Sequence, residues 1–314
     1  MKINNGMNKK DSLMNPDEID LIEIFEILLR AKKLIIFCTS FLVIISILIV
    51  TNLTNVYKSE ALLDVSGQKN HDSSISGLTG LASIAGIDVS GKSVDKSTLA
   101  IELIQSRAFV KHLISFDNIL PSLMAVSEFD SEERKIKYDP KKYNESEKKW
   151  VRKSRINRPS MPTYLETYEV YLKKVTVTKD QSTNLIKLSF EHESPLFAKE
   201  FLDLIINQAN ALLRAKDLRE SSDAIDFLVS EIPKSSLVTM KDGINQLVLS
   251  KLETQMLARI NTEYALKVID PAFVPEQAFR PKRKVIVILV SIFSFIFVSL
   301  CALISQRFQS KKMD

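Results

Sequence analysis

Two long apolar stretches, one near each end of the chain, dominate the pattern of hydrophobic and polar positions. Residues 34–57 carry no charge, and no charged residue lies between Lys284 and Arg307. An α-helix rises about 1.5 Å per residue, so about 20 apolar residues cross the roughly 30 Å hydrocarbon core of a bilayer. We therefore predict two transmembrane helices, at residues 34–55 and 285–305.

These stretches divide the chain into five parts. We expect a cytoplasmic tail with an amphipathic helix (1–33), the first transmembrane helix (34–55), a periplasmic domain (56–284), the second transmembrane helix (285–305) and a short cytoplasmic tail (306–314). The first stretch follows a polar tail of about thirty residues and has no small-residue cleavage site behind it, so it is interpreted as an uncleaved anchor.

Basic residues around the first stretch favour an N-terminus inside the cell. Arg30, Lys32 and Lys33 precede this stretch, and Lys58 follows it. The cations before the second stretch oppose this orientation. The first helix usually dominates and long loops translocate largely regardless of charge. Both termini are therefore expected in the cytoplasm, with the large loop outside the inner membrane.

The region between the stretches shows both strand and helix periodicity. Alternating runs predict strands at residues 57–65, 175–178, 185–192 and 264–270, and apolar residues three and four apart predict helices at residues 97–114, 164–172, 195–232 and 236–264. Ser194 and Pro195 form a typical helix start, and Pro233 ends or kinks that helix. The fold class is thus α+β, with a small α/β base and long projecting helices.

Three prolines lie immediately before the second stretch. Pro271, Pro275 and Pro281 lack the amide donor and fix φ, so residues 271–281 are not expected to form an ordinary helix. This stiff, extended junction is the first candidate functional element, although packing alone would also explain it.

A dense run of basic residues is the second candidate. Residues 134–158 hold eleven Lys or Arg side chains against three acids, with the only tryptophan, Trp150, among them. The simpler interpretation is a solvated surface. The alternative is an electrostatic site for lipid phosphate or an anionic polymer. The residues named for that alternative are Lys148, Lys149, Arg152, Lys153 and Arg155.

Signatures of catalysis are missing from the sequence. There is no phosphate-binding Gly-rich loop before a Lys, no nucleophile elbow and no Cys/His ligand spacing. The two cysteines, Cys38 and Cys301, both lie in the apolar stretches. We therefore expect a protein that is not an enzyme and that binds no cofactor, metal or nucleic acid.

Five segments in order resemble a known family. They are residues 17–25 (DEIDLIEIF), 57–63 (YKSEALL), 77–87 (GLTGLASIAGI), 188–195 (LSFEHESP) and 268–276 (VIDPAFVPE). Together with the two terminal spans, they resemble the Wzz-type chain-length determinants, or polysaccharide co-polymerases. Two features depart from that family: the second span has serines where relatives commonly have glycine, and the helical projection is short and interrupted at Pro233.

The resemblance implies a function in surface polysaccharide synthesis. It implies a homo-oligomeric ring in the inner membrane that regulates the O-antigen chain length of lipopolysaccharide together with the O-antigen polymerase and the undecaprenyl-diphosphate-linked polysaccharide. The alternative is an accessory co-polymerase for polymerisation and export of capsule or exopolysaccharide. A two-span sensor is the least favoured expectation, because the short tails leave no room for a cytoplasmic output module.

Overall fold

The computed structural model describes residues 28–65, 96–154, 159–234 and 238–310. The chain forms two compact units: residues 1–53 together with 281–314, and residues 54–280. Most of the tail 1–33, in which an amphipathic helix is expected, and the segment 77–87 lie outside the described residues.

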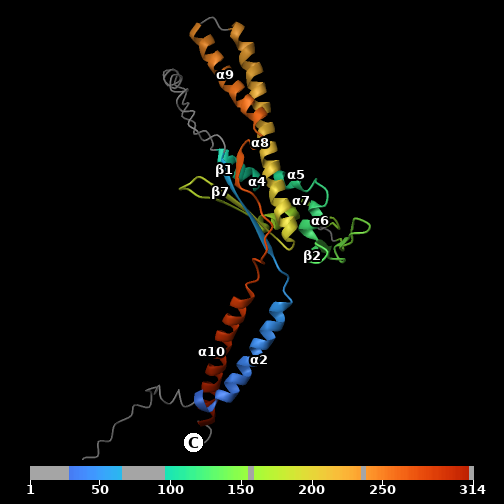
Figure 1. The fold of residues 1–314 in the computed structure, drawn as a ribbon, viewed down its shortest axis with the longest axis vertical. Helices are drawn as coiled ribbons and strands as arrows, with labels where there is room; N and C mark the ends of the chain where they lie inside the picture. Colours follow the sequence, from blue (N-terminus) through green and yellow to red (C-terminus); the bar gives the residue numbers. More distant parts are fainter. Residues whose placement is uncertain (1–27, 66–95, 155–158, 235–237, 311–314) are drawn as a thin grey trace, which may run out of the picture. The chain divides into compact units, whose positions relative to one another are not determined.

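The first unit is a pair of apolar helices, α2 (Lys32–Thr51) and α10 (Arg283–Ser310) (Figure 1). Both are long and apolar enough to cross a membrane, α10 over its first 23 residues. Ile35 near the start of α2 packs with Ala302 toward the end of α10. At the opposite end, Arg283 Nη2 donates a hydrogen bond to the Leu53 carbonyl at 3.0 Å. The two helices are therefore antiparallel.

Small side chains lie at the interface between these helices. Ser294 and Ala302 of α10 and Ser46 of α2 are all buried. Because lipid supplies no hydrophobic driving force between spans, close approach of the two backbones at small residues is an important source of packing.

The second unit contains a four-stranded antiparallel sheet in the order β6–β7–β1–β8. Its strands are β1 (Tyr57–Val65), β6 (Val175–Lys179), β7 (Ile186–His192) and β8 (Leu266–Asp270). All four expected strands are confirmed. Alternate residues of β1 are buried, as expected of a strand with one face on a core.

Helix α8 (Pro195–Glu231) covers the sheet and forms the core with it. Its aromatic residues Phe197 and Phe201 pack against Phe190 of β7, with ring centroids 6.2 and 4.7 Å apart. The Ser194 hydroxyl accepts a hydrogen bond from the Phe197 N–H at 3.2 Å, and Pro195 occupies the first turn, so the predicted helix start is confirmed.

A helical hairpin extends beyond the sheet. Helix α8 continues past the strands and ends at a single 3₁₀ turn, Ile232–Lys234, which contains Pro233. Helix α9 (Val238–Ile260) then runs back along α8 (Figure 1). Asn210 joins this hairpin to the sheet: its Oδ1 accepts from the Leu266 N–H at 2.8 Å, and its Nδ2 donates to the Leu266 carbonyl at 2.8 Å. The mixed α+β fold class is confirmed.

The helix expected at residues 97–114 is wrong as a single element. The structure has α4 (Lys96–Ile104) and α5 (Arg107–Leu113), separated at Ser106. The Ser106 hydroxyl accepts a hydrogen bond from the Phe109 N–H at 3.1 Å and so caps a new helix. The apolar stripe continues across this break, which is why periodicity alone did not reveal it.

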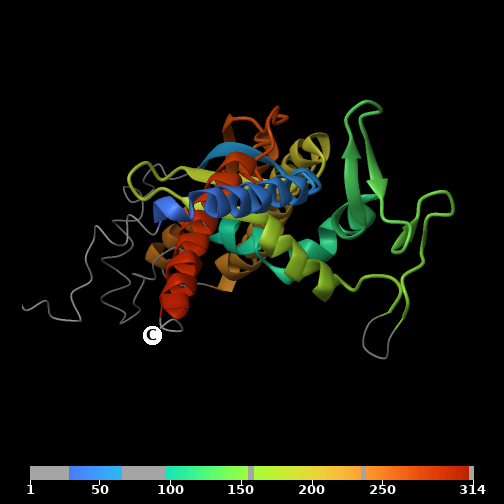
Figure 2. The same ribbon diagram turned by 90° about the horizontal axis from the view of Figure 1, so that it is seen from below.

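The basic run folds into small hairpins. Strands β2 (Val126–Asp130) and β3 (Lys135–Tyr138) form one, and β4 (Tyr143–Asn144) and β5 (Lys149–Trp150) form another. Figure 2 shows the β2–β3 hairpin, drawn in green, extending away from the four-stranded sheet. Helices α6 (Ile119–Met124) and α7 (Tyr164–Lys174) connect these hairpins to the core.

Candidate functional site

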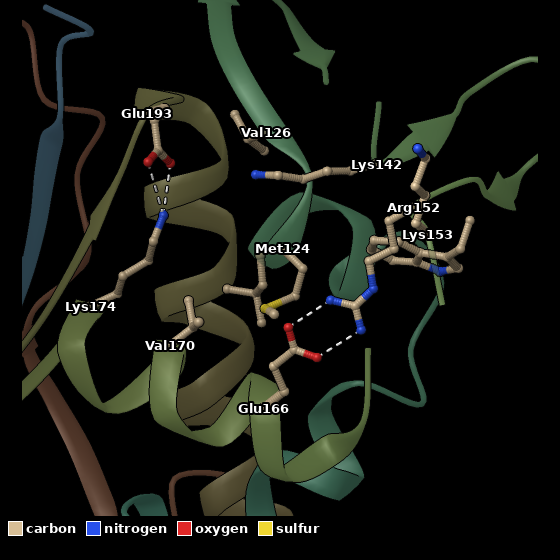
Figure 3. Close-up of a pocket in the computed structure, with 11 residues that line it drawn as sticks. Met124, Val126, Lys142, Arg152, Lys153, Glu166, Val170, Lys174 and Glu193 are labelled. Carbon is tan, nitrogen blue, oxygen red and sulfur yellow. Dashed lines mark hydrogen bonds and ion pairs between the residues drawn. The ribbon is translucent and has the colours of Figure 1, made fainter. Parts of the chain in front are cut away.

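A basic pocket lies between α6, α7 and the β4–β5 hairpin (Figure 3). Its volume is about 530 Å³, within the roughly 300–1,000 Å³ range of small-molecule sites. The basic pocket is lined by Leu123, Met124, Val126, Lys142, Trp150, Arg152, Lys153, Glu166, Val170, Lys174 and Glu193.

Arg152 is fixed in the pocket wall by several hydrogen bonds. Its Nη1 and Nη2 donate to the two carboxylate oxygens of Glu166 at 2.6 and 2.7 Å, and its Nε donates to the Ser160 carbonyl at 2.7 Å. The side chains of Arg152 and Glu166 are only 12% and 22% exposed. This two-pronged, largely buried pair is a structural cross-link between the basic run and α7.

The position of Glu166 follows from the start of α7. The Thr163 hydroxyl accepts a hydrogen bond from the Glu166 N–H at 3.2 Å, as in a capped helix with an acid in its first turn. The Glu166 carboxylate extends instead to Arg152, so the helix start and the basic run are joined through one residue.

A second ion pair closes the other side of the pocket. Lys174 Nζ lies 2.8 and 3.1 Å from the Glu193 carboxylate oxygens (Figure 3). Burial alone raises the pKa of Glu193, but the charge and hydrogen bond of Lys174, with a contribution from His192, lower that pKa below its usual value. Glu193 is therefore ionised at neutral pH, and its charge offsets that of Lys174.

Buried His192, next to Glu193 in the sequence, makes two hydrogen bonds to the backbone near this wall. Its Nδ1 accepts a hydrogen bond from the Ser194 N–H at 2.9 Å, so the proton lies on Nε2, which donates to the Ser122 carbonyl at 2.7 Å. Burial, together with the charge of Lys174, lowers the pKa of His192 to about 4. The neutral imidazole therefore joins α6 to the end of β7.

Two cations of the pocket keep an exposed charge. Lys153 is exposed and, within the described ranges, has no carboxylate within ion-pair distance. Lys142 is 47% exposed and lies 3.8 Å from Asp139 Oδ2, a weak surface pair. In Figure 3 the Lys142 side chain extends into the pocket. Net positive charge is therefore available there to an anionic group.

Trp150 places an aromatic surface beside these cations. Its ring lies 5.1 Å from that of Tyr143, which in turn lies 5.4 Å from that of Tyr138. An aromatic ring beside ammonium groups provides an apolar face with polar donors next to it. This combination suits the faces and acidic substituents of sugar rings.

The five basic residues named from sequence do not all meet in the pocket. Arg152 and Lys153 line it, whereas Lys148 and Lys149 lie at the turn and second strand of the β4–β5 hairpin. Arg155 lies outside the described residues. Sequence reasoning missed Glu166, Lys174 and Glu193. The Thr163 cap position was a detectable signal for Glu166, but nothing local marked the pair of Lys174 and Glu193.

The proline segment, residues 271–281, forms a strap along the start of β1. The Ser59 hydroxyl donates to the Phe273 carbonyl at 2.7 Å, while Val56 and Arg280 form a β-bridge with a Val56 N–H to Arg280 carbonyl distance of 2.9 Å. The strap contains no helix, as the prolines predict. Pro275 is buried, and Pro271 is exposed.

Cation–aromatic contacts reinforce the end of the strap. Lys58 Nζ and the Arg280 guanidinium lie 5.0 and 5.2 Å from the centre of the Phe279 ring. Arg280 Nη2 also lies 3.3 Å from Glu191 Oε1 of β7. The strap is therefore attached to two neighbouring strands by hydrogen bonds, a ring contact and an ion pair.

Comparison with known proteins confirms the family resemblance. Residues 17–115 match the family model "Wzz: Chain length determinant protein". No curated protein sequence matches the chain. The matched residues 17–115 include three of the five segments that resemble the family: 17–25, 57–63 and 77–87.

Solved structures give weaker similarities. A "full-length bacterial polysaccharide co-polymerase" is 11% identical, covers 93% of this chain and 99% of its own, and has a TM-score of 0.39. A "Fragment of WzzB, Polysaccharide Co-polymerase from Salmonella Typhimurium" is 9% identical, covers 72% of this chain and 100% of its own, and has a TM-score of 0.29.

Proposed function

We propose that this chain, whose residues 17–115 match the Wzz chain-length determinant model, regulates the O-antigen chain length of lipopolysaccharide in the bacterial inner membrane. The family match is the observation that carries the proposal. Two apolar helices flanking a mixed helix and strand unit support it, because such a chain suits a two-span membrane protein. Under this proposal the unit of residues 54–280 lies in the periplasm and both termini lie in the cytoplasm.

The proposed mode of action is an oligomeric scaffold that catalyses no covalent step. Copies of the chain associate into a ring, work with the O-antigen polymerase and contact the undecaprenyl-diphosphate-linked polysaccharide. Within the described residues, no group of three or more His, Cys, Asp or Glu side chains is arranged to hold a metal ion. The ion pairs of the basic pocket are balanced and fixed, which suits positioning more than proton transfer.

The basic pocket is the proposed contact for the polymer. Lys142 and Lys153 supply exposed positive charge, and Trp150 supplies an aromatic face. Lys148 and Lys149 extend the positive surface along the β4–β5 hairpin, where Lys149 lies 3.8 Å from Glu147. Acidic sugars or substituents in the polysaccharide would meet this surface.

Deleting the gene tests the proposed function. The length distribution of O-antigen on a gel is expected to broaden and lose its preferred length, and complementation with the intact gene restores it. An unchanged O-antigen ladder, with altered capsule or exopolysaccharide, would assign the chain to that polymer instead. An unchanged pattern of every surface polysaccharide would refute length control.

The proline strap, which precedes the second span in the sequence, is proposed to contribute to length control. Replacing Pro271, Pro275 and Pro281 with alanine releases φ at three positions and is expected to alter the preferred length while the protein still reaches the membrane. The measurement is the O-antigen ladder beside a membrane-fraction blot. A matched variant, Pro233→Ala, changes a proline between α8 and α9 and leaves the strap intact. A normal ladder from the triple variant would show that the prolines only end secondary structure.

A further inference from the structure

An apolar groove with a basic rim lies between α2 and α10. Its volume is about 450 Å³. Four aliphatic side chains, two from each helix, form its walls: Ile47 and Val50 of α2, and Val287 and Ile288 of α10. Arg283 and Lys284, the first residues of α10, line the groove together with Thr51.

The basic rim of the groove consists of Arg283 and Lys284, and no Asp or Glu lies beside them in the first turn of α10. The first turn of α10 contains Arg283 and Lys284 and no acid, although a helix N-terminus carries partial positive charge and normally favours anions. The backbone dipole and two cationic side chains therefore add to the same local potential. An anion placed there would be stabilised by all three.

Arg283 also retains an unused hydrogen-bond donor. Its Nη2 donates to the Leu53 carbonyl, which holds the guanidinium between the two helices. Its Nε is buried without a hydrogen-bond partner, one of only two such side-chain atoms found among the described residues. A buried donor without an acceptor costs free energy, and this cost is larger on a cation. An acceptor oxygen that reached this Nε would remove that cost.

The spacing of the two kinds of side chain matches a lipid. Val287 lies four residues after Arg283, so the aliphatic walls begin about 6 Å along the axis of α10 from the basic rim. In a bilayer, cations at the end of a span lie near lipid phosphates, and the next turn lies among acyl chains. One molecule with a phosphate head and a hydrocarbon chain therefore fits both parts of the groove.

We propose that the α2–α10 groove binds an anionic lipid, with its phosphate on Arg283 and Lys284 and its hydrocarbon chain against Ile47, Val50, Val287 and Ile288. The proposal rests on the membrane placement in the proposed function. The same chemistry is offered by a glycerophospholipid and by a polyprenyl phosphate. The experiment below distinguishes these two sources.

Native mass spectrometry of the purified full-length protein measures lipid retention. Samples are incubated separately with phosphatidylglycerol, undecaprenyl phosphate and zwitterionic phosphatidylcholine. The intact protein is expected to retain one or both anionic lipids in preference to phosphatidylcholine. The variant Arg283→Gln/Lys284→Gln is expected to lower that retention by roughly tenfold, because charge-assisted hydrogen bonds to phosphate are lost.

A matched control and a second variant distinguish the contribution of the two rim cations from that of the apolar groove wall. Lys282→Gln removes a neighbouring exposed cation that does not line the groove, and it is expected to retain the lipid. Val287→Phe fills the apolar wall, keeps both cations and is expected to lower retention. Circular dichroism and size-exclusion chromatography verify that each variant is folded. The lipid that is retained more strongly identifies the source.

Three results would overturn the proposal. They are unchanged retention in both groove variants, an equal loss in Lys282→Gln, and displacement of the lipid by inorganic phosphate as effectively as by a phosphate lipid. The last result would show an anion site without a hydrocarbon part. Lipid retention with a normal polysaccharide ladder after gene deletion would leave the groove valid and remove the proposed function. An altered ladder after gene deletion, with no lipid retained by the purified protein, would support the proposed function and remove the lipid site.

Discussion

Arg152 in the basic pocket and Arg283 at the start of α10 are used in opposite ways. The guanidinium of Arg152 has two short hydrogen bonds to Glu166 and another to a backbone carbonyl. Arg283 donates to one carbonyl, and its Nε is buried without a partner. The first arginine is a closed cross-link, and the second leaves binding capacity for an anion.

The contrast teaches that positive charge alone does not mark a binding site. Both arginines lie among other cations in the sequence. In the basic pocket, Glu166 and Glu193 neutralise Arg152 and Lys174, and only Lys142 and Lys153 keep exposed charge. At the start of α10 there is no acid in the first turn. The position of acids, which sequence proximity does not reveal, decides which cations remain available.

The largest expected effect comes from opening the closed cross-link. Arg152→Met removes two short hydrogen bonds from the largely buried Glu166 carboxylate, so the free energy of unfolding is expected to fall by about 2 kcal/mol, below the roughly 3–5 kcal/mol of a fully buried pair. Fluorescence of Trp150, the only tryptophan, reports unfolding in urea from within the same pocket.

Two further variants test whether the pair itself is responsible. Lys153→Met removes the adjacent exposed cation and is expected to change stability by less than about 0.5 kcal/mol. Arg152→Met/Glu166→Leu removes both charges and is expected to recover much of the loss. If Arg152→Met and Lys153→Met are equally stable, the ion pair of Arg152 does not stabilise the protein more than the exposed Lys153 does.

The sequence predicts the parts of the fold that depend on local pattern. The strands β1, β6, β7 and β8 follow from alternation, and the start of α8 follows from Ser194 and Pro195. The aliphatic character of α2 and α10 is equally visible. These features arise from residues close together in the chain, where periodicity and capping are the dominant physical effects.

The features that the sequence does not predict depend mostly on contacts between residues that are far apart in the chain. The basic run was expected to be mainly a solvated surface, yet the Tyr143–Trp150 ring contact and the Arg152–Glu166 pair fold part of it into a pocket wall. Ser106 interrupts a continuous apolar stripe by capping a second helix. The groove between α2 and α10 joins residues more than two hundred positions apart, so no local pattern indicates it.

A second prediction uses the closed network around His192. The pKa of His192 is about 4 in the native protein and about 6.5 in an unfolded chain, so below pH 6.5 the unfolded state binds a proton that the native state excludes. The stability contributed by neutral His192 is complete above about pH 6.5. It declines as pH falls toward 4, by up to about 1.4 kcal/mol per pH unit.

Urea unfolding followed by Trp150 fluorescence between pH 7 and 5 measures this decline. His192→Phe removes the titrating group and is expected to flatten the pH dependence, although loss of two hydrogen bonds lowers stability at pH 7. His112→Gln serves as the matched control, because His112 is only partly buried and hydrogen-bonds Gln208. An unchanged slope in His192→Phe would show that another group near the pocket titrates.

The smallest expected effect concerns the exposed cations of the basic pocket. Lys142→Gln/Lys153→Gln is expected to weaken binding of an acidic polysaccharide such as polygalacturonate by at least about twofold, because exposed ion pairs contribute roughly 0.2–1 kcal/mol each. Quenching of Trp150 fluorescence gives the affinity, and neutral dextran gives the uncharged reference.

Salt and a distant control determine whether the pocket behaves as an open site. Binding to the intact protein is expected to weaken between low and high ionic strength, and the double variant is expected to show less of this weakening. Lys251→Gln changes an exposed cation on α9 and is expected to have no effect. If the double variant binds normally at low salt, Lys142 and Lys153 are solvated surface charges and do not form a polymer contact.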